Sequence, residues 1–236
     1  MIESPEMLAK LERIERNSAE AVWAAVFNST VSNSVWLHDR AFSPRRWAVG
    51  FGYLYVLYRI LNEVRPTRIL DLGLGQTSKM IAQYAAAHPS VEHVIIEADP
   101  EWVGFFNQGY HLPANSRIVM SEYEMREYKG ESVRFYSGLA QKLSGQRFDL
   151  ISIDAPPSKG MVNYGRLDVL DLMPEALSPD CVLMMDDVQR VRERNAVGEI
   201  VAKLASFALG YKDETYHGDK DFSVICSERM RFLRSL

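Results

Sequence analysis

The feature that most restricts the fold is an alternation, from Pro66 onward, of short apolar segments with longer amphipathic segments. The apolar segments have the length of strands and cover residues 68–72, 93–97, 132–136, 148–153 and 181–185. The segments expected as helices are 77–87, one that starts near Pro100, a short one from Gly138, 167–177, and one that carries Val197 to Ala208. This alternation is typical of a parallel sheet with helices on both faces.

Two further segments, 211–216 and 222–226, flank the polar turn 217–221. A turn of this composition between two apolar runs predicts an antiparallel hairpin. We therefore predict an α/β fold, a Rossmann-like doubly wound sheet of seven strands in which the last strand is antiparallel.

The first 64 residues have a different pattern, which predicts helices rather than strands. Apolar residues recur at helical spacing in residues 7–14 and again in 19–27, residues 29–44 interrupt the pattern, and an aromatic-rich helix is expected over 47–62. We therefore expect a helical extension over residues 1–64 and a larger domain over 65–236. The extension could cover a substrate or form the contact of a homodimer.

The composition is that of a globular chain and excludes several classes of partner. With 27 Lys and Arg against 31 Asp and Glu, the net charge is −4, so no general positive field favours nucleic acid or an anionic membrane. No apolar run reaches the roughly 18 residues that a membrane span needs. The two cysteines, Cys181 and Cys226, lie in separate apolar runs, and we expect them to be buried free thiols. The expected location is the cytoplasm.

The sharpest local motif is Asp71-Leu-Gly73-Leu-Gly75, which joins an apolar strand to a helix. Glycine allows a tight turn and a close approach of the backbone to a ligand, and the following helix presents free amide groups. A dinucleotide-binding loop would have a third glycine at position 78, where this chain has Ser78. Asp71 suits a ligand that carries a positive charge, such as the amino group or sulfonium of S-adenosylmethionine. The alternative is a purely structural turn.

Glu97 ends the second strand roughly 20 residues beyond this loop, where an acid accepts hydrogen bonds from ribose hydroxyls. Ala98 beside it is small enough to let adenine lie flat.

With these motifs the chain resembles the class I S-adenosylmethionine-dependent methyltransferases over about residues 66–227. The resemblance is carried by Asp71-x-Gly73-x-Gly75-x-Thr77, Ile96-Glu97, the segment 148–154 and the terminal hairpin, and Thr77 stands where the family often has another glycine. It implies that S-adenosylmethionine is the cofactor, bound by Asp71, Gly73, Gly75, Thr77, Ser78, Glu97, Ala98, Ser137, Gly138 and Asp154.

Acidic residues follow two strands that we expect to be neighbours. Asp154 ends the segment 148–153, and Asp186 and Asp187 end the segment 181–185. Three converging carboxylates need a cation, and oxygen ligands suit Mg²⁺, Mn²⁺ or Ca²⁺, which could lower the pKa of an acceptor hydroxyl. This arrangement resembles that of the metal-dependent catechol-type O-methyltransferases, and also of methyltransferases that modify sugars. Two alternatives stay open: the two later aspartates cap the next helix, or the acids bind a substrate directly without metal.

Three residues near this edge are candidates for contact with an acceptor. Lys159 lies in the loop after Asp154 and could act as a base or hold an anion, or be solvated. Arg166 could clamp a carboxylate or phosphate of the acceptor, or pair with Asp168 or Asp171. Trp47, with the neighbouring Arg45 and Arg46, could stack on a polar acceptor, or belong to a buried amphipathic helix.

Taken together, the sequence predicts transfer of a methyl group from S-adenosylmethionine to an oxygen of a small molecule or sugar. Asp154 and Lys159 are the candidate catalytic residues, and Mg²⁺ or Mn²⁺ is a candidate second cofactor. One alternative is a binding module that holds a nucleoside without catalysis. A nicotinamide-dependent oxidoreductase is disfavoured by Asp71 and Ser78.

Overall fold

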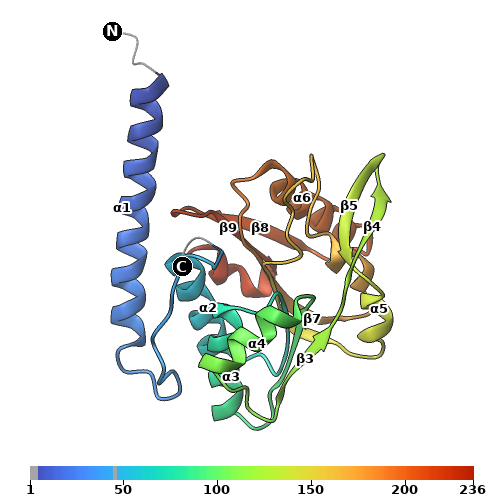
Figure 1. Ribbon diagram of the computed structural model, residues 1–236, viewed down its shortest axis with the longest axis horizontal. Coiled ribbons are helices and arrows are strands. Elements are labelled where there is room, and N and C mark those ends of the chain that lie inside the picture. The colour runs from blue at the N-terminus through green and yellow to red at the C-terminus, as the bar shows by residue number, and fades with distance from the viewer. Residues whose placement is uncertain (1–4, 45–46) are drawn as a thin grey trace.

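The computed structural model describes residues 5–44 and 47–236 and is shown in Figure 1. Within the described residues, one mixed sheet has the strand order β3-β2-β1-β6-β7-β9-β8, which makes seven strands. These strands are β1 (Arg68–Leu72), β2 (Glu92–Glu97), β3 (Ser116–Met120), β6 (Phe148–Ile153), β7 (Leu177–Met185), β8 (Tyr211–Tyr216) and β9 (Phe222–Ser227). Strands β3, β2, β1, β6 and β7 are parallel, and β9 is antiparallel to both β7 and β8. The predicted sheet with an antiparallel last strand is confirmed.

Helices lie on both faces of this sheet. They are α1 (Pro5–Val31), α2 (Phe51–Glu63), α3 (Gln76–Ala87), α4 (Pro100–Gly109), α5 (Leu139–Lys142) and α6 (Val191–Ser206), with 3-10 turns η1 (Asp168–Leu172) and η2 (Glu228–Arg234). Consecutive strand residues alternate between two apolar clusters: Leu183 and Met185 belong to one, and Val182 and Met184 to the other. Because alternate side chains of a strand point to opposite faces, each cluster fills one side of the sheet.

The third strand of the sheet lies elsewhere than predicted. Strand β3 (Ser116–Met120) holds that position, whereas the predicted strand 132–136 is part of β5 (Glu131–Tyr136), which pairs with β4 (Tyr123–Tyr128) in a separate antiparallel hairpin. Strand β3 lies at the edge of the sheet, has one neighbour and is only partly buried. It begins with the polar residues Ser116 and Arg117, and its three apolar residues follow one another, so it gives little apolar alternation. Val133 and Phe135 of β5 are apolar because the hairpin packs on the core.

The helix predicted over residues 167–177 is also wrong. The segment forms only the turn η1, and strand β7 then begins at Leu177, four residues before the predicted start. Pro174 has no amide hydrogen and cannot continue a helix through this segment.

At the N-terminus, the predicted helical pieces are one continuous helix of 27 residues, α1. Helix α2 begins at Phe51 rather than at residue 47.

Helix α1 has one face against the body and one face exposed. Glu20, Phe27 and Val31 are buried beside α2, while the N-terminal half of the helix extends beyond the rest of the chain (Figure 1). The exposed apolar residues of the opposite face include Leu8, Leu11, Ile14 and Val22, which are 47 to 63% exposed. Through Phe27 and α2 the extension shares an apolar cluster with the sheet.

Cys181 and Cys226 are free and buried, as predicted. Across residues 5–44 and 47–236, we find no helix with the length and apolar character of a bilayer-crossing segment.

Candidate functional site

The order in which strands are added to the sheet reverses between β1 and β6. The candidate residues gather at the carboxyl ends of these and the neighbouring strands. From β1 the chain runs outward through β2 to β3, and it then returns to β6 on the other side of β1. In open parallel sheets, ligands bind at such a switch point. The glycine loop follows β1, Glu97 is the last residue of β2, and Asp154 follows β6.

The glycine loop is fixed by two backbone amides that reach β2. Gly73 N donates to Ile96 O at 3.0 Å, and Leu74 N donates to Glu97 Oε2 at 3.1 Å. Gly73 has φ of +105°, and a Cβ there would lie 2.9 Å from the Cβ of Ala155. Position 73 therefore requires glycine both for its backbone conformation and for the close approach of the next loop. At Gly75, among the described residues, no atom lies within 4 Å of such a Cβ.

Asp71 lies beneath the loop and is fully buried. Its Oδ2 accepts hydrogen bonds from Ser78 Oγ at 2.6 Å and from Thr77 Oγ1 at 3.0 Å. Burial raises the pKa of Asp71 to about 6, although hydrogen bonds from the hydroxyls of Ser78, Ser152 and Thr77 act to lower this pKa. The structure thus uses Asp71, Thr77 and Ser78 to support the loop from inside. Their direct contact with a ligand stays a prediction.

Glu97 links the loop to the start of α4. Its Oε1 accepts from Ala98 N at 2.7 Å and from Asp99 N at 3.0 Å, in addition to the bond from Leu74 N to Oε2. An ionised carboxylate has about four acceptor positions. Three amides therefore fix the orientation of Glu97 and leave a position for one further donor.

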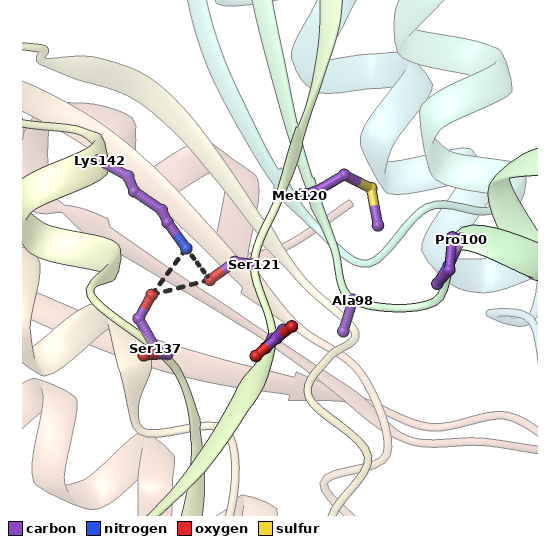
Figure 2. Close-up of a pocket in the computed structure, with 7 residues that line it drawn as sticks. Ala98, Pro100, Met120, Ser121, Ser137 and Lys142 are labelled. Atoms are coloured by element: carbon purple, nitrogen blue, oxygen red, sulfur yellow. Dashed lines mark hydrogen bonds between the residues drawn. The ribbon is translucent and has the colours of Figure 1, made fainter.

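A cavity of about 390 Å³ lies beside Ala98, the residue after Glu97 (Figure 2). Its lining residues are Ala98, Pro100, Met120, Ser121, Glu122, Ser137 and Lys142. Lys142 Nζ donates to Ser121 Oγ and to Ser137 O, both at 2.9 Å. Two predicted residues, Ala98 and Ser137, thus face the same cavity, and Gly138 follows as the left-handed residue before α5. Sequence analysis missed Ser121, because it did not identify β3, whose end forms one wall. It predicted the short helix after Gly138 but did not single out Lys142 at the end of that helix.

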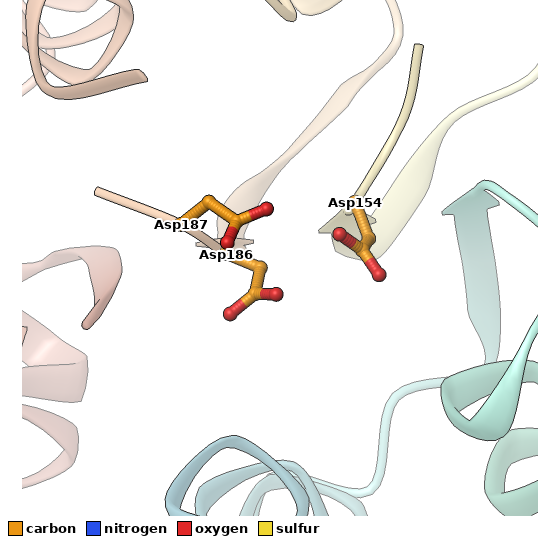
Figure 3. A group of neighbouring side chains, drawn as sticks. All are labelled: Asp154, Asp186 and Asp187. Atoms are coloured by element: carbon orange, nitrogen blue, oxygen red, sulfur yellow. The ribbon is translucent and has the colours of Figure 1, made fainter. Parts of the chain in front are cut away.

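The structure brings the three aspartates together (Figure 3). Ile153 and Met185 pair between β6 and β7, so the residues that follow them meet at the same edge. One carboxylate oxygen from each of Asp154, Asp186 and Asp187 lies within 4.8 Å of the other two. Asp154 has a side chain that is 19% exposed, whereas Asp186 and Asp187 are buried.

Cations of the chain itself contact this aspartate cluster. Arg166 Nη2 lies 3.1 Å from Asp154 Oδ1 and 2.9 Å from Asp187 Oδ2. Lys220 Nζ lies 3.3 Å from Asp186 Oδ2 and 3.5 Å from Asp187 Oδ1. Arg166 therefore does not pair with Asp168 or Asp171, the partners considered from the sequence. Asp171 pairs with Arg126, and Asp168 accepts from Tyr136 N.

The pKa values follow from burial and from these ion pairs. Burial raises the pKa of Asp154 well above its ordinary value. The positive charge of Arg166 acts to lower this pKa, and the negative charge of Asp186 raises it further. Burial acts in the same direction on Asp187, but Arg166, Lys220 and Arg190 outweigh it and lower the pKa of Asp187. Burial disfavours the charge of Lys220, yet the carboxylates raise its pKa. Lys220 is therefore a permanent cation at neutral pH and not a base.

The capping alternative for the later aspartates is wrong. Helix α6 begins at Val191, its N-cap residue is Arg190, and no side-chain hydrogen bond caps it. Gln189 instead donates from Nε2 to Asp187 Oδ1 at 3.3 Å. The two aspartates precede the helix by a short turn in which Asp187 has a positive φ of 66°.

The remaining candidates lie at the surface or are engaged within the protein. Lys159 is exposed in the loop after Asp154. Trp47 is 91% exposed and precedes α2 rather than forming part of a buried helix. Arg45 and Arg46 lie outside the described residues. Arg166, predicted as a substrate clamp, is only 4% exposed, and its guanidinium is occupied by the aspartates.

Comparison with protein-family models and with curated protein sequences finds no match. Solved structures do match. The O-methyltransferase TomG from Streptomyces achromogenes, involved in tomaymycin synthesis and solved in complex with SAM, is 15% identical, with 92% of this chain and 98% of that chain covered at a TM-score of 0.54. The O-methyltransferase from Bacillus cereus in complex with SAH is 13% identical, with 90% and 91% covered at a TM-score of 0.52. The chain has the fold of class I S-adenosylmethionine-dependent methyltransferases, as the sequence predicted.

We expect Gly73→Ala to lower the free energy of unfolding by more than about 1 kcal/mol, because the new methyl group meets Ala155 and φ is positive. The matched control is Gly198→Ala in α6, where, within the described part of the chain, no atom lies within 4 Å of the added Cβ. That change should stabilise the protein by up to about 1 kcal/mol. Urea unfolding of both variants measures the difference, and equal effects would contradict this account of the loop.

We expect Asp71→Asn to stabilise the protein at pH 8 by about 1–3 kcal/mol. The folded pKa of Asp71, about 6, lies above that of an unfolded Asp, so its favourable contribution is complete below about pH 4 and is lost as the pH rises through 6. The gain should therefore shrink on going from pH 8 to pH 4.5.

Asp149 is the control of opposite sign for this pH dependence. Burial alone would raise its pKa, but hydrogen bonds from Ser178, Thr67 and Arg68 lower it. Asp149→Asn should therefore destabilise the protein at pH 8, and less so as the pH falls. Urea unfolding across this pH range tests both variants, and a destabilised Asp71→Asn at pH 8 would contradict the expectation.

Proposed function

We propose that this protein is an S-adenosylmethionine-dependent methyltransferase that acts on a hydroxyl oxygen of a small molecule or sugar. The observation that supports it is one continuous edge that holds an open glycine loop, a carboxylate with a free acceptor position and an adjoining cavity of about 390 Å³. The fold agrees with this assignment.

Each part of this edge suits one part of the cofactor. The open space at Gly75 admits the close approach of a ligand to the backbone. The free acceptor position of Glu97 suits a ribose hydroxyl, and the cavity beside Ala98 and Ser137 suits adenine. S-adenosylmethionine supplies an activated methyl group on its sulfonium.

The contribution of the chain is mainly positioning. Asp154, the member of the aspartate cluster that follows β6, presents a partly exposed carboxylate beside the glycine loop. There it can accept a hydrogen bond from an acceptor hydroxyl and fix the position of the hydroxyl oxygen. Holding two reactants in line removes part of the entropic barrier to transfer, an effect of several kcal/mol. Because Lys159 is exposed, its proposed role is limited to holding the acceptor. Trp47 and Arg166 are proposed to act at the outer rim and beneath the site, respectively.

Two further parts of the proposal rest on other observations. Free, buried cysteines are usual in proteins of a reducing compartment, which supports a cytoplasmic location.

The alternative of a nucleoside-binding module without catalysis has the same cofactor site and differs only in turnover.

Titration calorimetry of the full chain tests cofactor binding. We expect S-adenosylhomocysteine to bind and NADH to give no heat. Glu97→Ala should weaken binding by at least about tenfold, the equivalent of one hydrogen bond to a charged group. Glu92→Ala, at the exposed amino end of the same strand, is the matched control and should bind as the wild type does. Absence of heat with either S-adenosylmethionine or its demethylated product would refute the proposal.

Turnover separates the enzyme from the binding module. We expect Asp154→Asn to bind S-adenosylhomocysteine but to lose transfer of labelled methyl groups to a panel of phenols and sugars. A wild type that binds cofactor but methylates none of them favours the module.

We also propose that α1 forms a parallel homodimer contact. Its exposed face carries Leu11, Ile14, Ser18, Ala21 and Ala25 at alternating steps of three and four residues, the spacing of a coiled-coil seam. Lys10 and Glu15 flank this seam at positions where each can pair with the other residue of a second copy. A self-complementary surface favours a two-fold partner of the same sequence.

Light scattering after size exclusion tests the dimer. We expect the wild type to be a dimer and the double variant Leu11→Glu, Ile14→Glu to be a monomer with unchanged unfolding of the body, because the seam is exposed within one chain. Arg13→Glu, outside the seam, changes the charge and should leave the dimer intact. A wild type that elutes as a monomer would exclude the contact.

A further inference from the structure

The aspartate cluster is already neutralised by cations of the same chain. Arg166 bridges Asp154 and Asp187, and Lys220 bridges Asp186 and Asp187, at the distances given above. Arg190 adds a third contact, 2.9 Å from Asp187 Oδ2. Three carboxylates thus face three cations, and a divalent ion would bring an excess of positive charge into a buried cluster.

Most of the carboxylate oxygens that a metal would need are also already paired. Mg²⁺ and Mn²⁺ prefer about six oxygen ligands, and Mg²⁺ binds them at roughly 2.0–2.1 Å. Here four of the carboxylate oxygens already contact Arg166, Lys220 or Arg190.

Arg166 and Lys220 are held in these positions by the fold. The side chain of Arg166 is 4% exposed, and its Nη1 also donates to Asp186 O at 2.9 Å. The side chain of Lys220 is 9% exposed and comes from the turn between β8 and β9. Displacing either cation would require burying its charge elsewhere or opening the edge of the sheet. The cluster, with its cations in place, therefore does not fit the divalent metal that was one of the candidates from the sequence.

We propose that Arg166 and Lys220 take the place of a divalent metal in this cluster, and that Arg166 holds Asp154 toward the acceptor. This inference rests on the proposed function and defines how the same site operates without metal. Arg166 and Lys220 are positioning residues. Two oxygens stand outside these ion pairs: Asp154 Oδ2, and Asp186 Oδ1, which is buried and has no hydrogen-bond partner among the described residues. Both suit a neutral hydroxyl donor.

Binding of Mn²⁺ to the full chain, followed by the electron paramagnetic resonance of the free ion, tests the inference without cofactor or acceptor. The wild type should show no saturable binding up to millimolar Mn²⁺. Lys220→Met removes the cation from Asp186 and Asp187 and should increase Mn²⁺ affinity at least tenfold. Lys220→Arg should restore the wild-type result, and Lys212→Met, at an exposed lysine of the same hairpin, should not change it.

Two results would overturn the inference. One is saturable Mn²⁺ binding by the wild type that Asp186→Asn abolishes. The other is a folded Lys220→Met protein that still binds no Mn²⁺. If Lys220→Met does not fold, the inference is tested by the Mn²⁺ titrations of the wild type and of Asp186→Asn alone. Failure of S-adenosylhomocysteine to bind would remove the proposed function but leave the Mn²⁺ result unaffected, so the two failures are distinguishable.

Discussion

The parallel pairing of β1 with β2 on one side and β6 on the other is the constraint on which the site depends. Because all three strands run in the same direction, the residues that follow them emerge at one edge. The glycine loop after β1 then lies between Glu97 at the end of β2, which accepts a hydrogen bond from it, and Ala155 after β6, which lies close to Gly73. A change in the register of either pair would separate residues that are far apart in the sequence.

Buried carboxylates near this edge are stabilised in two different ways. Asp71 has neutral hydroxyl donors, Ser78 and Thr77, and its pKa is raised by burial. Asp187 has guanidinium and ammonium partners, and its pKa is lowered. The first arrangement supports a loop whose backbone must stay open to a ligand. The second holds fixed charges in a region where Asp154 reaches the surface.

The comparisons and the geometry support different parts of the functional account. Structures at 13 to 15% identity establish the fold, which is shared by many enzymes with different acceptors. The proposed cofactor site depends on the contacts of Glu97 and on the cavity beside it. The nature of the charge compensation at the aspartates depends on Arg166 and Lys220, and our proposal that the cluster works without metal rests on these two residues.

The sequence by itself determined the elements with strong local patterns and the acids at their ends. Buried strands such as β1 and β6 are mainly apolar, so Asp71 near the end of β1 and Asp154 directly after β6 could be located from the sequence pattern alone. The order of the elements also predicted the doubly wound sheet. These properties depend on residues close together in the chain.

Only the tertiary structure decided which side chains meet. The edge strand β3 is partly polar and gave no clear pattern, so the cavity wall at Ser121 was missed. Lys220 lies in a polar turn whose sequence is that of any solvated hairpin, yet the antiparallel pairing of β9 with β7 brings it to Asp186. The positive charge that compensates Asp186 thus comes from Lys220, 34 residues away along the chain. Charges interact through space and leave no local periodicity in the sequence, so the sequence alone could not decide between this lysine and a metal ion.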